Sequence, residues 1–457
     1  MTYDYIIVGG GISGLYSAFR LVYKAAKDKN DTIISPTFNS PTIIPRILLL
    51  EKNNARHIGG RMGYYPFHNV DVSIGCGIGR KAKDTLLISL LHDLGVSYKE
   101  NQIFNQIADN IEYSADIPYI ISVLKKRFLE MDGKKCSMTF KEFALPILGK
   151  DLYSVFLMTC GYTDFENEDV YETLYYYGMD DNTPGWTGLS ISWKDLLASM
   201  LEKLDKKIEI KTEAEVVGID SGSDFTVTLA SGSKYSSKKI ILATTVNTVR
   251  KLLPRFSIYR DIVGQPFLRI YGKFSKECVP LLREHFSMGT MVKGPIHRII
   301  PINIDDGIFL IVYTDNKGAL ALKPYTDNTK KNRNHLCRLI ERTCDLPDKG
   351  LFLLDIVSFY WDIGTHYYKP LSSEFIKVYP RFCSQMATKQ LMTHILSADK
   401  YIYPLIEIKD GVECKYAREQ FVYNAQHPMP GMLVVGEMVS RNQGWIEGAL
   451  ESVDAVL

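Results

Sequence analysis

The hydrophobic pattern at the start of the chain predicts a strand, a tight turn and a helix in immediate succession. Residues 5–8 are an apolar run, glycines follow at G-x-G-x-x-G spacing, and apolar positions at helical spacing begin near residue 13. In such a unit the first glycine permits the turn, the second lets backbone N–H groups approach a pyrophosphate, and the third lets the helix pack on the strand. The residues expected to hold a dinucleotide here are Gly9, Gly11, Ile12, Ser13 and Gly14.

A second apolar strand, residues 46–50, ends at an acidic residue, Glu51, with Lys52 after it. An acid at this place accepts hydrogen bonds from the adenosine ribose and normally lies ~20 residues beyond the glycines. The spacing here is longer because residues 28–45, rich in Asn, Ser, Thr and Pro, read as an inserted surface loop. Long surface loops cost little closure entropy, so the geometry of the site is preserved.

Further along, the pattern changes twice between helical and strand periodicity. Residues 83–94 and 120–129 have helical spacing, and most of 101–178 is expected to be helical. A helix at 192–204 is followed by strand-like runs up to residue 244, and alternation becomes less regular over 265–405. The fold class predicted is α/β: a discontinuous Rossmann-like nucleotide-binding domain and a mixed α+β second domain. The expected boundaries are 1–82, 186–262 and 406–457 for the first domain, and 83–185 and 263–405 for the second.

Composition narrows the choice of partner. The 457 residues suffice for two domains, and 54 basic against 52 acidic residues leave a formal charge of +2. No global field attracts nucleic acid or an anionic membrane, so a small molecule is expected. No apolar run approaches the ~18 residues of a membrane span and no signal peptide is evident, which favours a soluble, cytoplasmic or otherwise intracellular protein.

The eight cysteines are scattered without C-x-x-C pairs. This distribution indicates neither a zinc site nor a disulfide framework, and no metal is expected. The oligomeric state stays open.

Three motifs in order give the chain a resemblance to the flavin-containing amine oxidase family over nearly its full length. They are the glycine turn with Glu51, the sequence Gly59-Gly60-Arg61, and a terminal Gly436-Glu437 followed by residues 444–449, GWIEGA. A dehydrogenase that uses only NAD would share the first motif and has no reason for the other two. The resemblance implies FAD, and the absence of a cysteine near residues 364–365 implies that it is held without a covalent bond.

The cofactor roles follow partly from physics and partly from the resemblance. A guanidinium at Arg61 can compensate the pyrophosphate charge, with Gly60 allowing close approach. The N-terminus of the last helix, near Trp445 and Ile446, can stabilise an anionic reduced flavin by ~0.3–2 kcal/mol. The resemblance further implies contacts with ribityl hydroxyls, adenine and the strand end near the cofactor; those residues are Gly436, Glu437, Val216, Val217 and Ala243.

On the substrate side, the resemblance implies a cage of aromatic rings beside the flavin. Trp445 matches one wall, and His366, Tyr367 or Tyr368 is expected to provide the other. Side chains alternate along a strand, so His366 and Tyr368 share a face and the choice stays open. Arg269 stands where the family usually has a lysine implicated in the reaction with oxygen, and arginine stays charged at any working pH.

The expected reaction is hydride transfer from an amine α-carbon to flavin N5, giving an imine that hydrolyses to an aldehyde or ketone. O2 would be reduced to H2O2, although Arg269 leaves the acceptor open. One alternative keeps FAD and replaces the amine by a porphyrinogen, a polyene or a nucleotide sugar. Another is a non-catalytic protein in which FAD is structural and the surface binds a partner.

Overall fold

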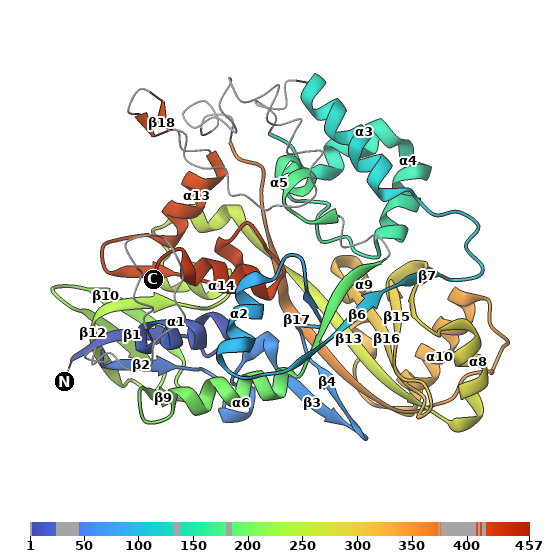
Figure 1. The fold of residues 1–457 in the computed structure, drawn as a ribbon, viewed down its shortest axis with the longest axis horizontal. Helices are drawn as coiled ribbons and strands as arrows, with labels where there is room; N and C mark the ends of the chain where they lie inside the picture. Colours follow the sequence, from blue (N-terminus) through green and yellow to red (C-terminus); the bar gives the residue numbers. More distant parts are fainter. Residues whose placement is uncertain are drawn as a thin grey trace.

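The computed structural model describes residues 2–23, 45–131, 137–179, 185–372 and 417–457, with Phe375 and the short strands Ile408–Lys409 and Val412–Glu413. Nearly all of the insertion expected at 28–45 lies outside the described residues. In Figure 1 the strands near the N-terminus form one body, a second sheet lies to its right, and a group of helices lies above the second sheet.

The first sheet contains the strand that opens the chain. Its order is β10-β11-β12-β1-β2-β9, with β20 paired to β12. β12, β1, β2, β9 and β20 run parallel, which is typical of a sheet covered by helices on both faces. The bounds are β1 Thr2–Val8, β2 Ile47–Leu50, β9 Glu209–Lys211, β10 Val216–Ser221, β11 Phe225–Leu229, β12 Lys234–Leu242 and β20 Met432–Val434.

Helices cover this sheet on both faces. One hydrophobic core joins it to α1 (Ile12–Val22), α2 (Thr85–Asp93), α6 (Trp193–Leu204) and α14 (Ile446–Asp454). A second core joins its other face to α7 (Val246–Leu252) and α13 (Ala417–Gln426). The expected boundary at residue 83 assigned α2 to the second domain, but the leucines of α2 pack with α14. The sequence could not predict this, because amphipathicity shows that a helix has a buried face and not which sheet that face meets.

The second sheet is mostly antiparallel, in the order β17-β13-β16-β15-β14-β7. Its longest members pair over most of their length, and the end of β17 enters the core of the first sheet, where Tyr368 is 1% exposed. The strands are β7 Asn105–Ile107, β13 Ile262–Phe274, β14 Gly289–Met291, β15 Arg298–Asn303, β16 Ile308–Asp315 and β17 Leu353–Tyr368. α8 (Val279–His285), α9 (Asn316–Leu322) and α10 (Lys330–Cys344) pack with this sheet.

The helices above the second sheet in Figure 1 are α3 (Ile117–Glu130), α4 (Phe140–Cys160) and α5 (Val170–Tyr175), which share a core of their own. Within the described ranges, α4 alone is long and apolar enough to cross a membrane. Gly149 interrupts it with non-helical backbone, and Phe140, Tyr153 and Phe156 are buried against its neighbours, as in the core helix of a globular unit.

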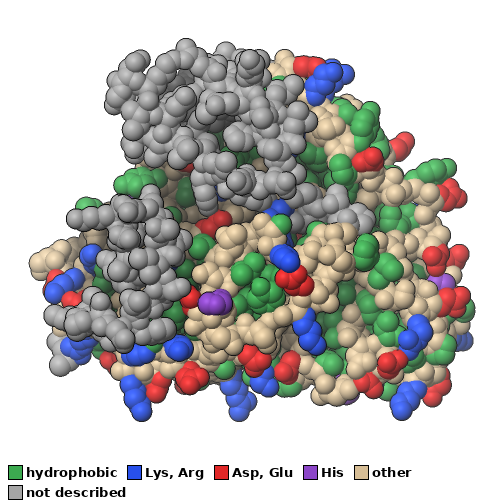
Figure 2. Space-filling model, in the orientation of Figure 1, with side chains coloured by type: hydrophobic (Ala, Val, Ile, Leu, Met, Phe, Trp, Pro, Cys, Tyr) green, Lys and Arg blue, Asp and Glu red, His purple; other side chains and the backbone are tan. Residues whose placement is uncertain are grey.

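Short strands replace part of the helix expected over 101–178. β6 belongs to a small sheet of order β5-β8-β6, and another small sheet, β3-β4, lies earlier in the chain. Long-range pairing determines that this segment is a strand, because β6 is hydrogen-bonded to β8, which follows the helices α3 to α5 in the sequence. The bounds are β3 Tyr64–Phe67, β4 Val70–Ser73, β5 Gly79–Arg80, β6 Tyr98–Ile103 and β8 Trp186–Ile191. On the face drawn in Figure 2, acidic and basic side chains are interspersed and gather in no single-sign patch.

Candidate cofactor-binding and active site

The three motif glycines differ in why the protein needs them. Gly9 has φ 111°, and a Cβ there would lie 2.4 Å from the carbonyl oxygen of Ala243. A Cβ on Gly14 would lie 1.9 Å from the Gly9 oxygen. Gly11 has ordinary extended backbone, φ −74°, and a Cβ there would meet no described atom within 4 Å. Neither the backbone conformation nor the packing of described residues requires a glycine at position 11. The remaining physical reason for a glycine there is to keep the space in front of the turn open.

The N-terminus of α1 and the second glycine motif meet at this turn. Gly11 is the N-cap of α1, whose first turn, residues 12–15, holds no acidic residue and receives no side-chain cap. The Gly59 amide donates to the Gly10 oxygen at 2.8 Å, and a Cβ on Gly60 would meet only the Gly11 Cα, at 3.6 Å, among the described atoms. Gly11 and Gly60 thus form a surface without side chains beside free helix N–H groups, as a pyrophosphate requires.

Glu51 lies at the end of β2, 7% exposed, where a ribose acceptor was expected. Its Oε2 accepts from the Gly10 amide at 2.8 Å, and its Oε1 accepts from the backbone and side chain of Asn53, both at 2.9 Å. Its backbone oxygen accepts from the Ala214 amide, which brings the segment leading into β10 beside it. In that segment Val216 is buried and Val217 is 53% exposed; Lys52 is exposed.

Arg61 reaches across to the terminal motif. Its Nη1 donates to a carboxylate oxygen of Glu437 and to the backbone oxygen of Gly364, both at 2.7 Å. The sequence placed Arg61 at the pyrophosphate alone; the structure shows that the same side chain also joins the two halves of the site. Nη1 is engaged by protein, while Arg61 keeps further N–H donors and a 28% exposed side chain for an anion.

Glu437 is the centre of this buried network. Besides Arg61, its carboxylate contacts His366 Nδ1 at 2.5 Å and accepts from the Gly444 amide at 3.1 Å. His366 Nε2 accepts from the Val246 amide at 3.3 Å, so Nδ1 carries the proton that faces Glu437. Burial raises the pKa of Glu437, but the interactions with His366 and Arg61 outweigh it and hold the pKa well below its usual range. The carboxylate is therefore ionised at neutral pH.

The terminal motif is held by packing as well as by this network. Gly436 has φ 127°, and a Cβ on Gly448 would lie 2.0 Å from the backbone oxygen of Asn442. Trp445 is the N-cap of α14, and the Arg80 guanidinium lies 3.9 Å from the centre of its ring. Ile446 is 5% exposed. These contacts fix the direction of the α14 N-terminus, which points toward the Gly444 and Glu437 end of the site.

Arg269 is almost fully buried, 3% exposed, on β13. Its Nη1 donates to Ser73 Oγ at 2.6 Å and to Tyr271 at 3.2 Å, and Nη2 donates to Tyr313 at 3.3 Å, over whose ring the guanidinium also stacks. No carboxylate among the described residues pairs with it, and its Nε has no hydrogen-bond partner. A buried cation that has only neutral partners is stabilised when an anion binds beside it.

The aromatic run at the end of β17 is divided between two environments. His366 belongs to the Glu437 network, and Tyr367 lines a pocket described below. Tyr368 shares the inward face with His366, as alternation predicted, but its hydroxyl donates to the Ser440 oxygen at 2.9 Å and its ring packs on Phe421. Of the three candidates, the structure therefore brings His366 and Tyr367 to the site and places Tyr368 in the core.

A turn at residues 75–77, for which the sequence predicted no role, lies between Arg61 and Arg269. A Cβ on Gly75 would lie 2.3 Å from the Arg61 backbone oxygen, to which the Cys76 amide donates at 2.8 Å. A Cβ on Gly77 would lie 2.9 Å from Arg269 Nη2. The sequence carries a signal for this turn in its three glycines within residues 75–79, and in the structure they follow β4.

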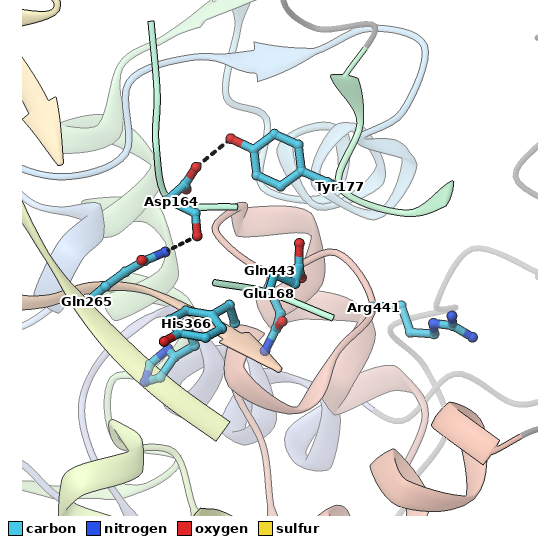
Figure 3. Close-up of a pocket in the computed structure, with 8 residues that line it drawn as sticks. Asp164, Glu168, Tyr177, Gln265, His366, Arg441 and Gln443 are labelled. Atoms are coloured by element: carbon cyan, nitrogen blue, oxygen red, sulfur yellow. Dashed lines mark hydrogen bonds between the residues drawn. The ribbon is translucent and has the colours of Figure 1, made fainter. Parts of the chain in front are cut away.

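A small pocket adjoins this network, and the sequence reading named only two of its residues (Figure 3). It has room for about one water-sized group, about 10 Å³. Figure 3 shows Asp164 and Tyr177 on one side, Gln265 and His366 on another, and Arg441 directed away. The lining is completed by Glu168, Tyr367 and Gln443.

Comparison with known proteins gives a class of fold. No protein-family model matches the sequence, and no curated protein does. Among solved structures, the two-domain FAD amine oxidase fold is matched over the whole chain.

Structures of putrescine oxidase are among those that match. A double mutant of that enzyme has a TM-score of 0.66 at 12% identity, covering 100% of this chain and 98% of the other. The wild-type enzyme bound to putrescine gives 0.64 at 12% identity, with the same coverage. A triple mutant gives 0.63 at 14% identity, covering 99% and 97%. At such identity the likeness establishes the fold, which agrees with the fold class that the sequence predicted.

Proposed function

We propose that the chain binds FAD without a covalent bond and oxidises a small-molecule amine. The observation that supports the cofactor is at Gly11, where neither the backbone nor the packing of described residues requires glycine and no described side chain fills the space beside α1. The residues around it suit the rest of a dinucleotide, with Arg61 for phosphate and Glu51 for a ribose. The whole-length likeness to an oxidase of a diamine supports the reaction class.

When bound, FAD would supply two-electron chemistry: it would take a hydride from the amine α-carbon, leaving an imine that water would hydrolyse to an aldehyde or ketone, and O2 is the proposed acceptor of the two electrons. The residues of the chain would hold and orient the cofactor and the substrate. The α1 N-terminus and Arg61 would bind the pyrophosphate, Glu437 would accept from hydroxyl groups of the cofactor, and the α14 N-terminus at Trp445 would favour negative charge on the ring. Trp445 and Tyr367 are the aromatic side chains that we propose line the substrate.

The test is direct. Purified protein should be yellow or become so with FAD, and a panel of mono-, di- and polyamines should bleach the flavin without oxygen and release H2O2 with it. A yellow protein that no amine reduces would reject amine oxidation and leave the cofactor proposal standing. A protein that stays colourless after incubation with FAD would reject both.

Arg269 supports one alternative substrate class. Its buried guanidinium, with neutral partners and a free Nε, suits a substrate that carries an anionic group. Benzoate and benzylamine differ in this charge and should perturb the flavin spectrum differently. If the alternative holds, benzoate binds, benzylamine is not oxidised, and Arg269→Gln weakens benzoate binding roughly 10- to 100-fold by removing a charged hydrogen-bond donor. Oxidation of benzylamine without benzoate binding would reject it.

We further propose an intracellular location, as expected from the sequence. Its support is that the five cysteines within the described residues are all free thiols. Localisation of the tagged protein would test this location and identify the compartment.

A further inference from the structure

The indole of Trp445 lies at the proposed active site without being held by a hydrophobic core. Trp445 is partly exposed and belongs to none of the cores that the described residues form, whereas Ile446, the next residue, is buried in the core beneath α14. Gly444, which precedes it, is exposed and has no side chain to pack on the ring. The orientation of the ring therefore depends on contacts other than core packing.

A buried guanidinium supplies such a contact. Arg80, at the end of β5, is 2% exposed, and its guanidinium lies 3.9 Å from the centre of the Trp445 ring. The attraction between a cation and the face of an aromatic ring is strongest for tryptophan and increases when the pair is removed from water. The guanidinium therefore favours this orientation of the indole over those that turn its face away.

Asp84 fixes the guanidinium in turn. Its Oδ1 accepts from Arg80 Nε at 2.8 Å and lies 2.7 Å from Nη2, and its Oδ2 accepts from the backbone amide of Arg80 at 2.7 Å. Asp84 is also the N-cap of α2, where an aspartate normally accepts from an amide of the helix, and its side chain makes no such bond. The carboxylate therefore serves Arg80 in place of the helix.

Glu447, in the first turn of α14, provides the missing cap of α2. Its Oε1 accepts from the Leu86 amide at 2.7 Å and from Thr85 Oγ1 at 3.2 Å. Its Oε2 accepts from the Leu87 amide at 2.9 Å. These bonds hold the backbone that follows Trp445 against α2, so the remaining freedom of Trp445 is rotation of its side chain.

We propose that Arg80 is a positioning residue, which holds the indole of Trp445 in the orientation that forms one wall of the substrate site. The guanidinium acts on the substrate only through the ring. Without it, the indole would occupy other rotamers for part of the time, and the reaction would slow by the fraction of productive orientation that is lost. The inference rests on the proposed amine oxidation and adds a residue on which that site depends.

The activity test uses the FAD-loaded enzyme and measures the rate constant at which a saturating amine reduces the flavin without oxygen. Arg80→Met/Asp84→Asn removes both charges together, and the asparagine keeps an oxygen for the backbone amide of residue 80. We expect the rate constant to fall roughly 3- to 30-fold, the factor to which a desolvated cation–π contact corresponds, with the Kd for FAD unchanged. Arg80→Lys keeps the charge without the planar guanidinium and should lower the rate constant less.

A double-mutant cycle separates positioning from a general structural role. In a Trp445→Ala background, Arg80→Met/Asp84→Asn should cause no further fall in the rate constant, because the ring on which Arg80 acts is gone. Arg20→Met/Asp454→Asn is the matched control, since it removes an ion pair at the other end of α14 and should leave the rate constant unchanged. Equal falls with and without the Trp445 ring would overturn the inference.

A second measurement needs neither cofactor nor substrate. Protein labelled with 5-fluorotryptophan has four fluorine resonances, one for each tryptophan, and Trp445→Phe assigns the relevant one. That resonance should broaden or split in Arg80→Met/Asp84→Asn, because the indole samples more than one orientation, while the others keep their linewidths. A single resonance of unchanged linewidth would overturn the inference.

The two measurements also separate this inference from the proposed function. Failure of every amine to reduce the flavin would reject the proposed function, and the fluorine spectra would still decide whether Arg80 holds the ring. Should Arg80→Met/Asp84→Asn not fold, Arg80→Lys takes its place in both measurements. A wild-type rate constant together with a wild-type linewidth in Arg80→Lys would then overturn the inference.

Discussion

Replacing Gly11 by valine is expected to give a folded protein that binds FAD much more weakly. Valine readily adopts the extended backbone found there, φ −74°, and its Cβ would meet no described atom within 4 Å, so the fold should tolerate the change. The added methyl groups would occupy the side-chain-free surface beside α1. A misfit of this size typically costs ~1–3 kcal/mol, so the Kd for FAD should rise roughly 10- to 100-fold or more.

Titration of apo-protein with FAD, followed by flavin fluorescence, measures this effect, and circular dichroism with thermal unfolding checks the fold. Gly222→Val is the matched control, because a Cβ there meets only the Asp224 backbone oxygen, at 3.6 Å, far along the chain from the turn. Unchanged FAD affinity in Gly11→Val would contradict the cofactor site. Gly14→Ala should behave differently and lose stability, since its Cβ would lie 1.9 Å from the Gly9 oxygen.

The sequence predicted the strand, turn and helix of this segment well because their determinants are local. The three elements follow one another within the first 22 residues, and the positive φ of Gly9 and the close contact of Gly14 agree with the reasons given for those two glycines, while the role of Gly11 stays a prediction. The second motif was also recognisable, and its docking on Gly10 follows from backbone groups alone. Local pattern is sufficient where the backbone itself forms the binding surface.

The remaining features depend on contacts between distant residues. Arg61 and Glu437 are 376 positions apart, and the two amides facing the pocket, on Gln265 and Gln443, come from different elements. Alternation could not separate Tyr368 from His366, because both face inward and are buried. Their tertiary partners separate them, since Tyr368 packs on Phe421 of α13 and His366 bonds to Glu437. Periodicity identifies the buried face of a strand, whereas the neighbour that buries it is set by tertiary packing.

The buried network at Glu437 yields the second large expected effect, which depends on pH. Glu437→Gln removes the charge that pairs with Arg61 and His366, and its amide would present N–H groups to donors such as the Gly444 amide. Breaking a buried pair while leaving its partners in place costs about 3 kcal/mol, which we expect as the loss in free energy of unfolding at neutral pH. Glu209→Gln, at an exposed strand position bonded to Tyr3, is the control and should cost under about 1 kcal/mol.

The pH dependence follows from the direction of the pKa shift. In the folded protein the pKa of Glu437 lies below the value of ~4.3 that it has in the unfolded chain, so the unfolded state takes up the proton first as pH falls. The stability that Glu437 contributes is therefore complete above about pH 5 and declines as pH drops toward the lowered pKa. Urea unfolding of wild type and Glu437→Gln between neutral pH and the acid limit of folding should show curves that converge at low pH. A difference that stays constant, or that widens on acidification, would mean that the carboxylate is not the ionised partner of Arg61 and His366.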